Sequence, residues 1–156
     1  MKIIGTGSSL PQKVVTNDDL AAIMDTSDEW ISSRTGIRKR HIATTETTTS
    51  LAVEAVKAAL SDAGTDGSEI DLIIAASVTG DKIVPSLACQ IQAEIGADSA
   101  VAFDINAACS GFLFALATAD AYFKTGRFHK AVILGAEVLS KIMDWNDRST
   151  CVLFGD

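Results

Sequence analysis

Three short apolar runs, separated by helical patterns, constrain the fold of this chain most strongly. They cover residues 70–76 (IDLIIAA), 100–105 (AVAFDI) and 131–136 (AVILGA), and each is almost continuously apolar. Strands of this kind are buried on both faces, which is typical of a parallel sheet with helices on each side. We therefore predict an α/β layered fold with a mixed, mostly parallel sheet.

Helical patterns fill the intervals between these runs. Residues 50–63 carry an amphipathic stripe that is followed by Gly64, and residues 85–96 begin with proline and end with glycine. Residues 110–124 are apolar almost all round, so we expect this helix to be central and buried. The alternation of strands and helices supports the layered fold.

The two ends of the chain give shorter patterns. Residues 2–5 and 151–154 (CVLF) are expected to form strands, the second of them as the start of a longer element. Asn17 is expected to cap one short helix, and residues 26–27 to begin another that ends before Gly36. The chain ends directly after an apolar run, so we expect it to be part of a longer protein.

Composition excludes several classes of protein. The chain has 156 residues, 47% of them hydrophobic, which is enough for one domain with a sizeable core. A net charge of −7 argues against general affinity for nucleic acid or anionic membranes. No apolar run is long enough to span a bilayer, and the first residues are too short for a signal peptide. We expect a cytoplasmic protein.

Cys109 lies at the first turn of the predicted helix 110–124, directly after a buried strand. Free N–H groups and the positive end of the dipole at such a turn favour thiolate over thiol. Cys109 is therefore a candidate nucleophile, and the alternative is a small, inert core residue. No histidine is adjacent, and His41 and His129 show no metal-ligand spacing, so we expect no metal site.

Trp30 and Arg34 are four residues apart, so they share one face of a short helix. Together they can stack on a planar ring and bind a phosphate. A Trp in the core beside a solvated Arg is the interpretation that spacing alone favours. Residues 34–41 also form a basic cluster that either meets phosphates or an acidic partner, or is simply solvated.

Several motifs, taken in order, resemble the 3-oxoacyl-[acyl-carrier-protein] synthase III family of the thiolase superfamily. They are DTSDEWI (25–31), RTGI (34–37), PS (85–86), AACSGF (107–112), DR (147–148) and FGD (154–156). The resemblance implies a thiolase-like fold of two similar halves in five αβαβα layers, and a homodimer. The chain is similar to the N-terminal half, so we expect residues 1–156 to be one N-terminal thiolase-like domain. The family's catalytic His and Asn lie in the C-terminal half.

The same resemblance implies roles for individual residues. Cys109 matches the acyl-carrying nucleophile, whose N–H is one oxyanion-hole donor. Val84 matches a position, often Phe, that lines the acyl pocket of the partner subunit. The residues that match coenzyme A contacts are Thr26, Trp30, Arg34 and Arg148.

The implied function is an acyltransferase that initiates type II fatty-acid synthesis. It would move an acyl group from acetyl-CoA, or another short acyl-CoA, to Cys109 and condense it with malonyl-acyl carrier protein. Acyl-CoA is then a substrate, and no separate cofactor is expected. The alternatives are another CoA-dependent condensing enzyme of the superfamily, or an isolated half-domain without full turnover.

Overall fold

The computed structural model describes residues 1–156, which fold as two compact units. The sheet unit comprises Met1–Ser9 and Thr48–Glu137, and the hairpin unit comprises Leu10–Thr47 and Val138–Asp156. Each unit contains its own cluster of buried apolar side chains. None of the helices has both the length and the hydrophobicity that a bilayer span requires.

The sheet unit is built on three parallel strands, as the sequence predicts. They are β3 (Leu72–Ala76), β4 (Val101–Ile105) and β5 (Ala131–Gly135), in the order β4-β3-β5. Every residue of β3 is buried, because this strand is central and helices cover both of its faces. The mostly parallel sheet is therefore confirmed.

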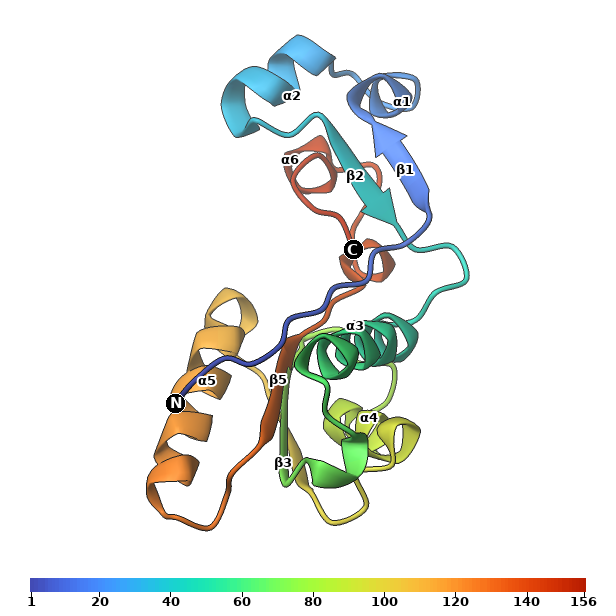
Figure 1. Ribbon diagram of the computed structural model, residues 1–156. Helices are drawn as coiled ribbons and strands as arrows, with labels where there is room; N and C mark the ends of the chain where they lie inside the picture. Colours follow the sequence, from blue (N-terminus) through green and yellow to red (C-terminus); the bar gives the residue numbers. More distant parts are fainter. The chain divides into compact units, whose positions relative to one another are not determined.

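Three helices complete the sheet unit: α3 (Thr48–Ala63), α4 (Leu87–Ile95) and α5 (Gly111–Lys124). In Figure 1, α5 lies on one side of β3 and β5, while α3 and α4 lie on the other. A short 3₁₀ turn, η1 (Gly67–Glu69), precedes β3. The unit thus has three layers, helix, sheet and helix.

Alternate residues of β3 serve the two helical layers, because successive side chains of a strand point to opposite faces. Ile73 and Ala75 belong to the cluster that contains buried residues of α3 and α4. Leu72 and Ile74 belong to the cluster that contains Ala115 of α5. This alternation explains why the strand is continuously apolar in sequence.

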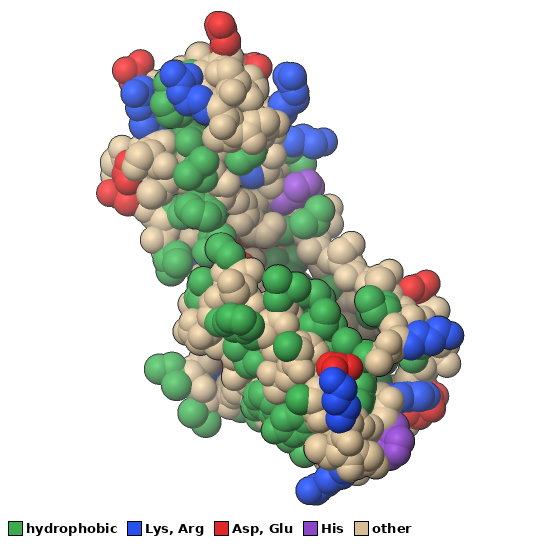
Figure 2. All heavy atoms as spheres, turned by 90° about the vertical axis from the view of Figure 1, so that its left-hand side faces the viewer, with side chains coloured by type: hydrophobic (Ala, Val, Ile, Leu, Met, Phe, Trp, Pro, Cys, Tyr) green, Lys and Arg blue, Asp and Glu red, His purple; other side chains and the backbone are tan.

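The helix α5 is less buried than its apolar sequence predicts. Only Gly111, Ala115 and Ala119 of this helix are buried, and Leu113 is 64% exposed. Figure 2 shows hydrophobic side chains gathered on the face of the molecule to which α5 contributes. The expectation of a fully buried helix is wrong for this chain, because only one side of α5 packs on the sheet.

The hairpin unit contains an antiparallel pair of strands that the sequence analysis did not predict. The strands are β1 (Lys13–Thr16) and β2 (Lys39–Ile42), with Lys13 opposite Ile42. Two helices, α1 (Asn17–Ala21) and α2 (Asp28–Thr35), connect them. A small apolar cluster forms the core, and its buried members are Leu20, Ile31, Cys151 and Val152.

The caps of these helices agree with the sequence in part. Ser27 caps α2 by accepting a hydrogen bond from the N–H of Trp30, and Gly36 ends it with a positive φ of 75°. The cap of α1 is Thr16 rather than Asn17, because Thr16 and Asp19 form a reciprocal capping box. Asn17 is instead buried inside the unit.

Two predicted strands do not form. Residues 2–5 have no ladder partner, and Ile3 is 71% exposed. Residues 151–154 lie at and after the end of the short helix α6 (Arg148–Cys151), which begins at the Asp147 cap. The remaining 3₁₀ turns are η2 (Ala108–Ser110) and η3 (Leu139–Lys141). A short apolar run is a strand only where another strand can pair with it.

Candidate active site

Cys109 lies in η2, the 3₁₀ turn between β4 and α5, and its side chain is exposed. The hydrogen bonds of this turn run from Ser110 N to Ala107 O and from Gly111 N to Ala108 O. Neither bond uses the N–H of Cys109. The predicted position at the helix start is confirmed, and the buried-core interpretation is wrong.

The residue before the cysteine has an unusual backbone. Ala108 has a φ of +45°, and it is the single non-glycine residue of the chain with a positive φ. This conformation strains an L-residue and recurs at functional sites, where the surrounding structure holds it. The turn that presents Cys109 is therefore set by its neighbours rather than by the local preference of the chain.

The residue that begins α5 explains how the helix start approaches the sheet. A Cβ added to Gly111 would lie 2.9 Å from the Cβ of Ala76, the last residue of β3. Real Cβ atoms do not come so close, so a glycine is required at this contact. The first turn of α5 thus rests on the carboxyl end of β3, where ligands bind in parallel α/β sheets.

His129 is not placed to act as a base for Cys109. The main-chain N–H of His129 donates to Asp71, directly before the first residue of β3, at the amino ends of the strands. Cys109 follows the carboxyl end of β4, at the opposite edge of the sheet. The ring of His41, in the hairpin unit, contacts the carbonyl oxygen of Pro11 at 2.6 Å.

The other two cysteines have different surroundings. Cys89 is half-buried on α4, with its Sγ 3.8 Å from the carbonyl oxygen of Ala102. Cys151 is fully buried, and burial raises the pKa of its thiol. Cys109 is thus the one exposed thiol of the chain, and the core interpretation of Cys89 and Cys151 holds.

Trp30 lies close to two arginines in the hairpin unit. The guanidinium carbon of Arg34 is 4.6 Å from the centre of the indole ring, and that of Arg148 is 4.9 Å away. Arg34 comes from the same helix, α2, whereas Arg148 begins α6 and donates to the carbonyl oxygen of Asp25 at 2.5 Å. Trp30 also packs on the core of the unit while remaining partly exposed.

This arrangement leaves no gap for a ring between Trp30 and Arg148. A planar base between the two groups would need a separation of about 7 Å, twice the usual contact distance. The guanidinium of Arg148 would therefore have to move outward by about 2 Å to admit a base. In this structure, the cation–π contact with Arg148 covers the face of the indole ring.

The other two residues implied by the resemblance are placed differently. Thr26, just before the Ser27 cap, has a hydroxyl that is buried without a hydrogen-bond partner. Such a group is costly, and a rearrangement of the segment would be needed to expose it. Val84 is 83% exposed on the loop that precedes α4.

Sequence reasoning missed the role of Arg40. It was grouped with a basic surface cluster, but its side chain is only 5% exposed. It donates to Asn17 Oδ1 at 2.8 Å and to the carbonyl oxygen of Val152 at 3.1 Å. Arg40 therefore joins segments of the hairpin unit and is not available to a phosphate.

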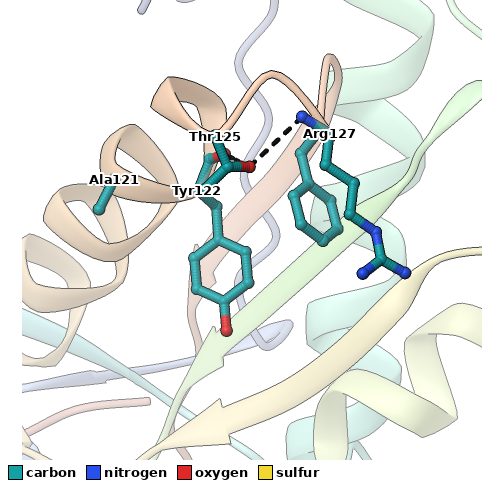
Figure 3. Close-up of a pocket in the computed structure, with 5 residues that line it drawn as sticks. Ala121, Tyr122, Thr125 and Arg127 are labelled. Carbon is teal, nitrogen blue, oxygen red and sulfur yellow. Dashed lines mark hydrogen bonds between the residues drawn. The ribbon is translucent and has the colours of Figure 1, made fainter.

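A depression of about 560 Å³ lies elsewhere in the sheet unit, at the C-terminal end of α5 (Figure 3). Tyr122 and Arg127 line it, and Thr125 Oγ1 accepts a hydrogen bond from the N–H of Arg127. Cys109 precedes the other end of this helix of 14 residues, about 20 Å away. The depression is therefore separate from the cysteine.

Comparison with known proteins gives the class of the fold. Over 99% of the chain, the structure matches 3-oxoacyl-[acyl-carrier-protein] synthase III from Aquifex aeolicus with 55% identity and a TM-score of 0.97. A priming β-ketosynthase of the R1128 polyketide pathway matches with 38% identity and a TM-score of 0.96, also over 99% of the chain. The chain covers 50% and 47% of these two structures. The fold is that of one half of a thiolase-like protein.

Comparison of the sequence with known sequences points to the same proteins as the comparison of structures. Residues 103–156 match the family model described as 3-oxoacyl-[acyl-carrier-protein] synthase III. A β-ketoacyl-[acyl-carrier-protein] synthase III of Streptococcus pneumoniae is 57% identical over 155 residues, 99% of this chain. The chain spans about half the length of the curated relatives it matches. Over nearly its whole length the chain is therefore similar to about half of a 3-oxoacyl-[acyl-carrier-protein] synthase III.

Proposed function

We propose that residues 1–156 are the N-terminal thiolase-like domain of a condensing enzyme that initiates type II fatty-acid synthesis. The single observation that carries the proposal is the exposed thiol of Cys109 in the strained turn before α5. The names of the relatives support the reaction, and their greater length means that a second half would complete the enzyme.

In the first half-reaction, the thiolate of Cys109 attacks the carbonyl carbon of an acetyl or short acyl-CoA thioester. The tetrahedral oxyanion accepts a hydrogen bond from the N–H of Cys109, which the bonds of the turn leave free. The intermediate collapses, the CoA thiolate leaves and takes up a proton, and the acyl group remains on sulfur.

In the second half-reaction, malonyl-acyl carrier protein loses CO₂ and the resulting carbanion attacks the acyl-Cys109 thioester. The products are 3-oxoacyl-acyl carrier protein and the free thiolate. Decarboxylation needs hydrogen-bond donors for the enolate oxygen. The resemblance assigns these donors to a His and an Asn of the other half, consistent with the position of His129 at the opposite edge of the sheet from Cys109.

The hairpin unit would hold the nucleotide end of coenzyme A. Trp30 supplies the aromatic face for the adenine, Arg148 closes on its other side, and Arg34 binds a phosphate. Thr26 would contact the nucleotide after its segment rearranges. Trp30→Ala is expected to raise the KM for acyl-CoA while changing kcat less, because the ring binds a part of the substrate that does not react.

Val84 would line the acyl pocket of the partner subunit in a homodimer. Its small side chain would leave room for branched or longer starters, whereas the resemblance implies that Phe is common at this position. Isobutyryl-CoA and acetyl-CoA turnover should be compared in the full-length enzyme and in Val84→Phe. An unchanged ratio of the two rates in the variant would exclude this role.

The proposal includes the remaining expectations for the complete protein. It would be a cytoplasmic homodimer that takes acyl-CoA and malonyl-acyl carrier protein as substrates. It would use neither a metal nor a cofactor beyond these substrates, and it would bind neither nucleic acid nor a membrane.

The test of the function is the complete condensation in the full-length protein. Wild type should convert acetyl-CoA and malonyl-acyl carrier protein to 3-oxoacyl-acyl carrier protein. Cys109→Ser should lose this activity, because a hydroxyl is a far weaker nucleophile without a base. Cys89→Ser is the matched control and should retain it, since Cys89 is half-buried on α4. Acyl-enzyme formation by Cys109→Ser would refute the assignment.

A second candidate is a condensing enzyme of another pathway within the superfamily. The 38% identity to a priming β-ketosynthase of polyketide synthesis favours it as the alternative. Turnover with a carrier protein from a polyketide pathway, but not with that of fatty-acid synthesis, would select this candidate. Acylation of Cys109 without any condensation would instead indicate a half-domain that lacks full turnover.

A further inference from the structure

The loop between β3 and α4, residues 77–86, carries two protruding apolar side chains. Ile83 and Val84 are 96% and 83% exposed, the highest values among the large apolar residues of the chain. The nearest buried residues on the two sides are Thr79, at 8% exposure, and Leu87, at 0%. The exposed pair is therefore the tip of a loop that is held at both ends.

The first end of the loop is attached to the start of α3. The carboxylate of Asp81 accepts hydrogen bonds from the N–H groups of Thr48, at 3.3 Å, and Thr49, at 2.7 Å. The hydroxyl of Thr48 in turn donates to the carbonyl oxygen of Thr79 at 2.7 Å. An acidic side chain is stabilised at a helix N-terminus, so this contact is a firm one.

The second end is attached to β4 through Asp104. Its two carboxylate oxygens accept hydrogen bonds from Leu87 N at 2.8 Å and from Ala88 N at 2.7 Å. The hydroxyl of Ser86 accepts from the next N–H, that of Cys89, at 3.3 Å. The three N–H groups at the start of α4 are thus satisfied, two of them by a carboxylate on a neighbouring strand.

Asp104 consequently connects the loop that carries Val84 to the strand that precedes Cys109. Leu87 follows Val84 by three residues, and Asp104 itself lies in β4, the strand that leads into the turn of Cys109. We propose that Asp104 is a positioning residue that holds the Val84 tip in register with β4 and so sets acyl-chain selectivity. This inference rests on the proposed function, in which Val84 lines an acyl pocket.

The test is the substitution Asp104→Asn in the full-length protein. Asparagine has the size of aspartate but no charge. Its NH₂ group would face a main-chain N–H, and two donors cannot hydrogen-bond to each other. The first turn of α4 should become more mobile, and Ile83 and Val84 should become more mobile with it. The ratio of kcat/KM for isobutyryl-CoA to that for acetyl-CoA should then move toward one by about threefold or more, since such pockets separate methylene-sized differences by 10- to 200-fold.

Asp71→Asn is the matched control. Asp71 also accepts two main-chain hydrogen bonds, from His129 at 2.7 Å and Lys130 at 3.2 Å, but at the amino end of the sheet. Both variants should lower the melting temperature, whereas only Asp104→Asn should change the selectivity ratio. A lowered melting temperature with an unchanged ratio in Asp104→Asn would overturn the proposal, because a merely structural residue behaves in that way.

Hydrogen exchange separates this inference from the proposed function. If wild type fails to acylate Cys109 with either acyl-CoA, the proposed function is refuted. Whether Asp104 anchors the loop is then decided by the rate of hydrogen exchange at the main-chain amides of Leu87, Ala88 and residues 82–84. Exchange at least about tenfold faster in Asp104→Asn than in Asp71→Asn supports the anchoring, since tenfold corresponds to a measurable local opening. Equal exchange in the two variants overturns it.

Discussion

The sheet unit and the hairpin unit are held together by different interactions. In the sheet unit, β3 is buried on both faces between two large apolar clusters. In the hairpin unit, the apolar cluster is small, and buried Arg40 links Asn17 to the main chain of Val152. Cys109 is thus presented by a close-packed layer, and Trp30 by a framework of directional polar contacts.

The difference predicts how substitutions should lower the stability of each unit. Apolar burial is roughly proportional to area, so truncation in the sheet unit costs the lost area plus a cavity. Removing one member of a polar network costs more than its hydrogen bonds contribute on balance, because its partners stay buried without hydrogen bonds. The following substitutions test this contrast, and urea unfolding of the full-length protein measures each effect.

The largest effect is expected in the centre of the sheet. Ile73→Ala should lower the free energy of unfolding by about 4 kcal/mol, because Ile73 is fully buried between β3 and the α3–α4 layer. The control Ile83→Ala removes an isoleucine that is 96% exposed, and it should change stability by less than about 0.5 kcal/mol. Similar losses in both variants would contradict the description of this core.

Arg40→Ala should lower the free energy of unfolding by about 3 kcal/mol. Its removal leaves Asn17 Oδ1 and the carbonyl oxygen of Val152 without their donor. Lys39, the exposed neighbour on β2, is the matched control, and Lys39→Ala should be close to neutral. If Arg40→Ala were equally neutral, the polar framework would not be what stabilises the hairpin unit.

A smaller change of opposite sign is expected at the turn before Cys109. Ala108→Gly should raise the free energy of unfolding by about 1 kcal/mol, since glycine adopts a φ of +45° without strain. Ala107 has a φ of −147°, so Ala107→Gly should instead lower stability. Destabilisation by Ala108→Gly would mean that the turn carries no backbone strain.

The smallest effect concerns pH in the hairpin unit. The carboxylate of Glu46 accepts hydrogen bonds from the N–H groups of Gln12, Thr44 and Thr45, which lower its pKa from 4.5 to about 2. A depressed pKa in the folded state contributes stability above the unfolded pKa and loses it as pH falls toward the folded one. Stability should therefore decline between pH 4.5 and about 2, in part through this group.

Glu46→Gln isolates that contribution. The variant should show a shallower loss of stability from about pH 5 down to about pH 3 than wild type. Glu94→Gln, which removes an exposed carboxylate of α4, is the matched control. Identical slopes for wild type and Glu46→Gln would show that these hydrogen bonds do not favour the ionised carboxylate.

The same contrast explains what the sequence could predict. Continuous apolar runs identified all three strands of the parallel sheet, because burial on both faces leaves a pattern within five residues. The strands β1 and β2, KVVT and KRHI, are short and largely polar, so nothing in them indicated pairing. The run CVLF looked like a strand, but the cap at Asp147 begins a helix there.

The candidate site was predictable to a similar degree. A strand followed by a helix placed Cys109 correctly at the helix start, since this depends on local sequence. The spacing of Trp30 and Arg34 indicated a shared helix face, and the contact forms. The approach of Arg148 to Trp30 comes from a distant segment, and only the resemblance pointed to that residue. Nothing in the sequence indicated that Arg40 is buried, because the local sequence does not distinguish a buried arginine from an exposed one.

The most direct test of the account is the position of an acyl adduct. The full-length protein should be incubated with acetyl-CoA alone, digested and analysed by peptide mass spectrometry. We predict one acetyl group on the peptide that contains Cys109 and none on Cys89 or Cys151, since Cys109 alone is an exposed thiol at a helix start. An adduct on another residue, or no adduct while condensation proceeds, would contradict the role of Cys109.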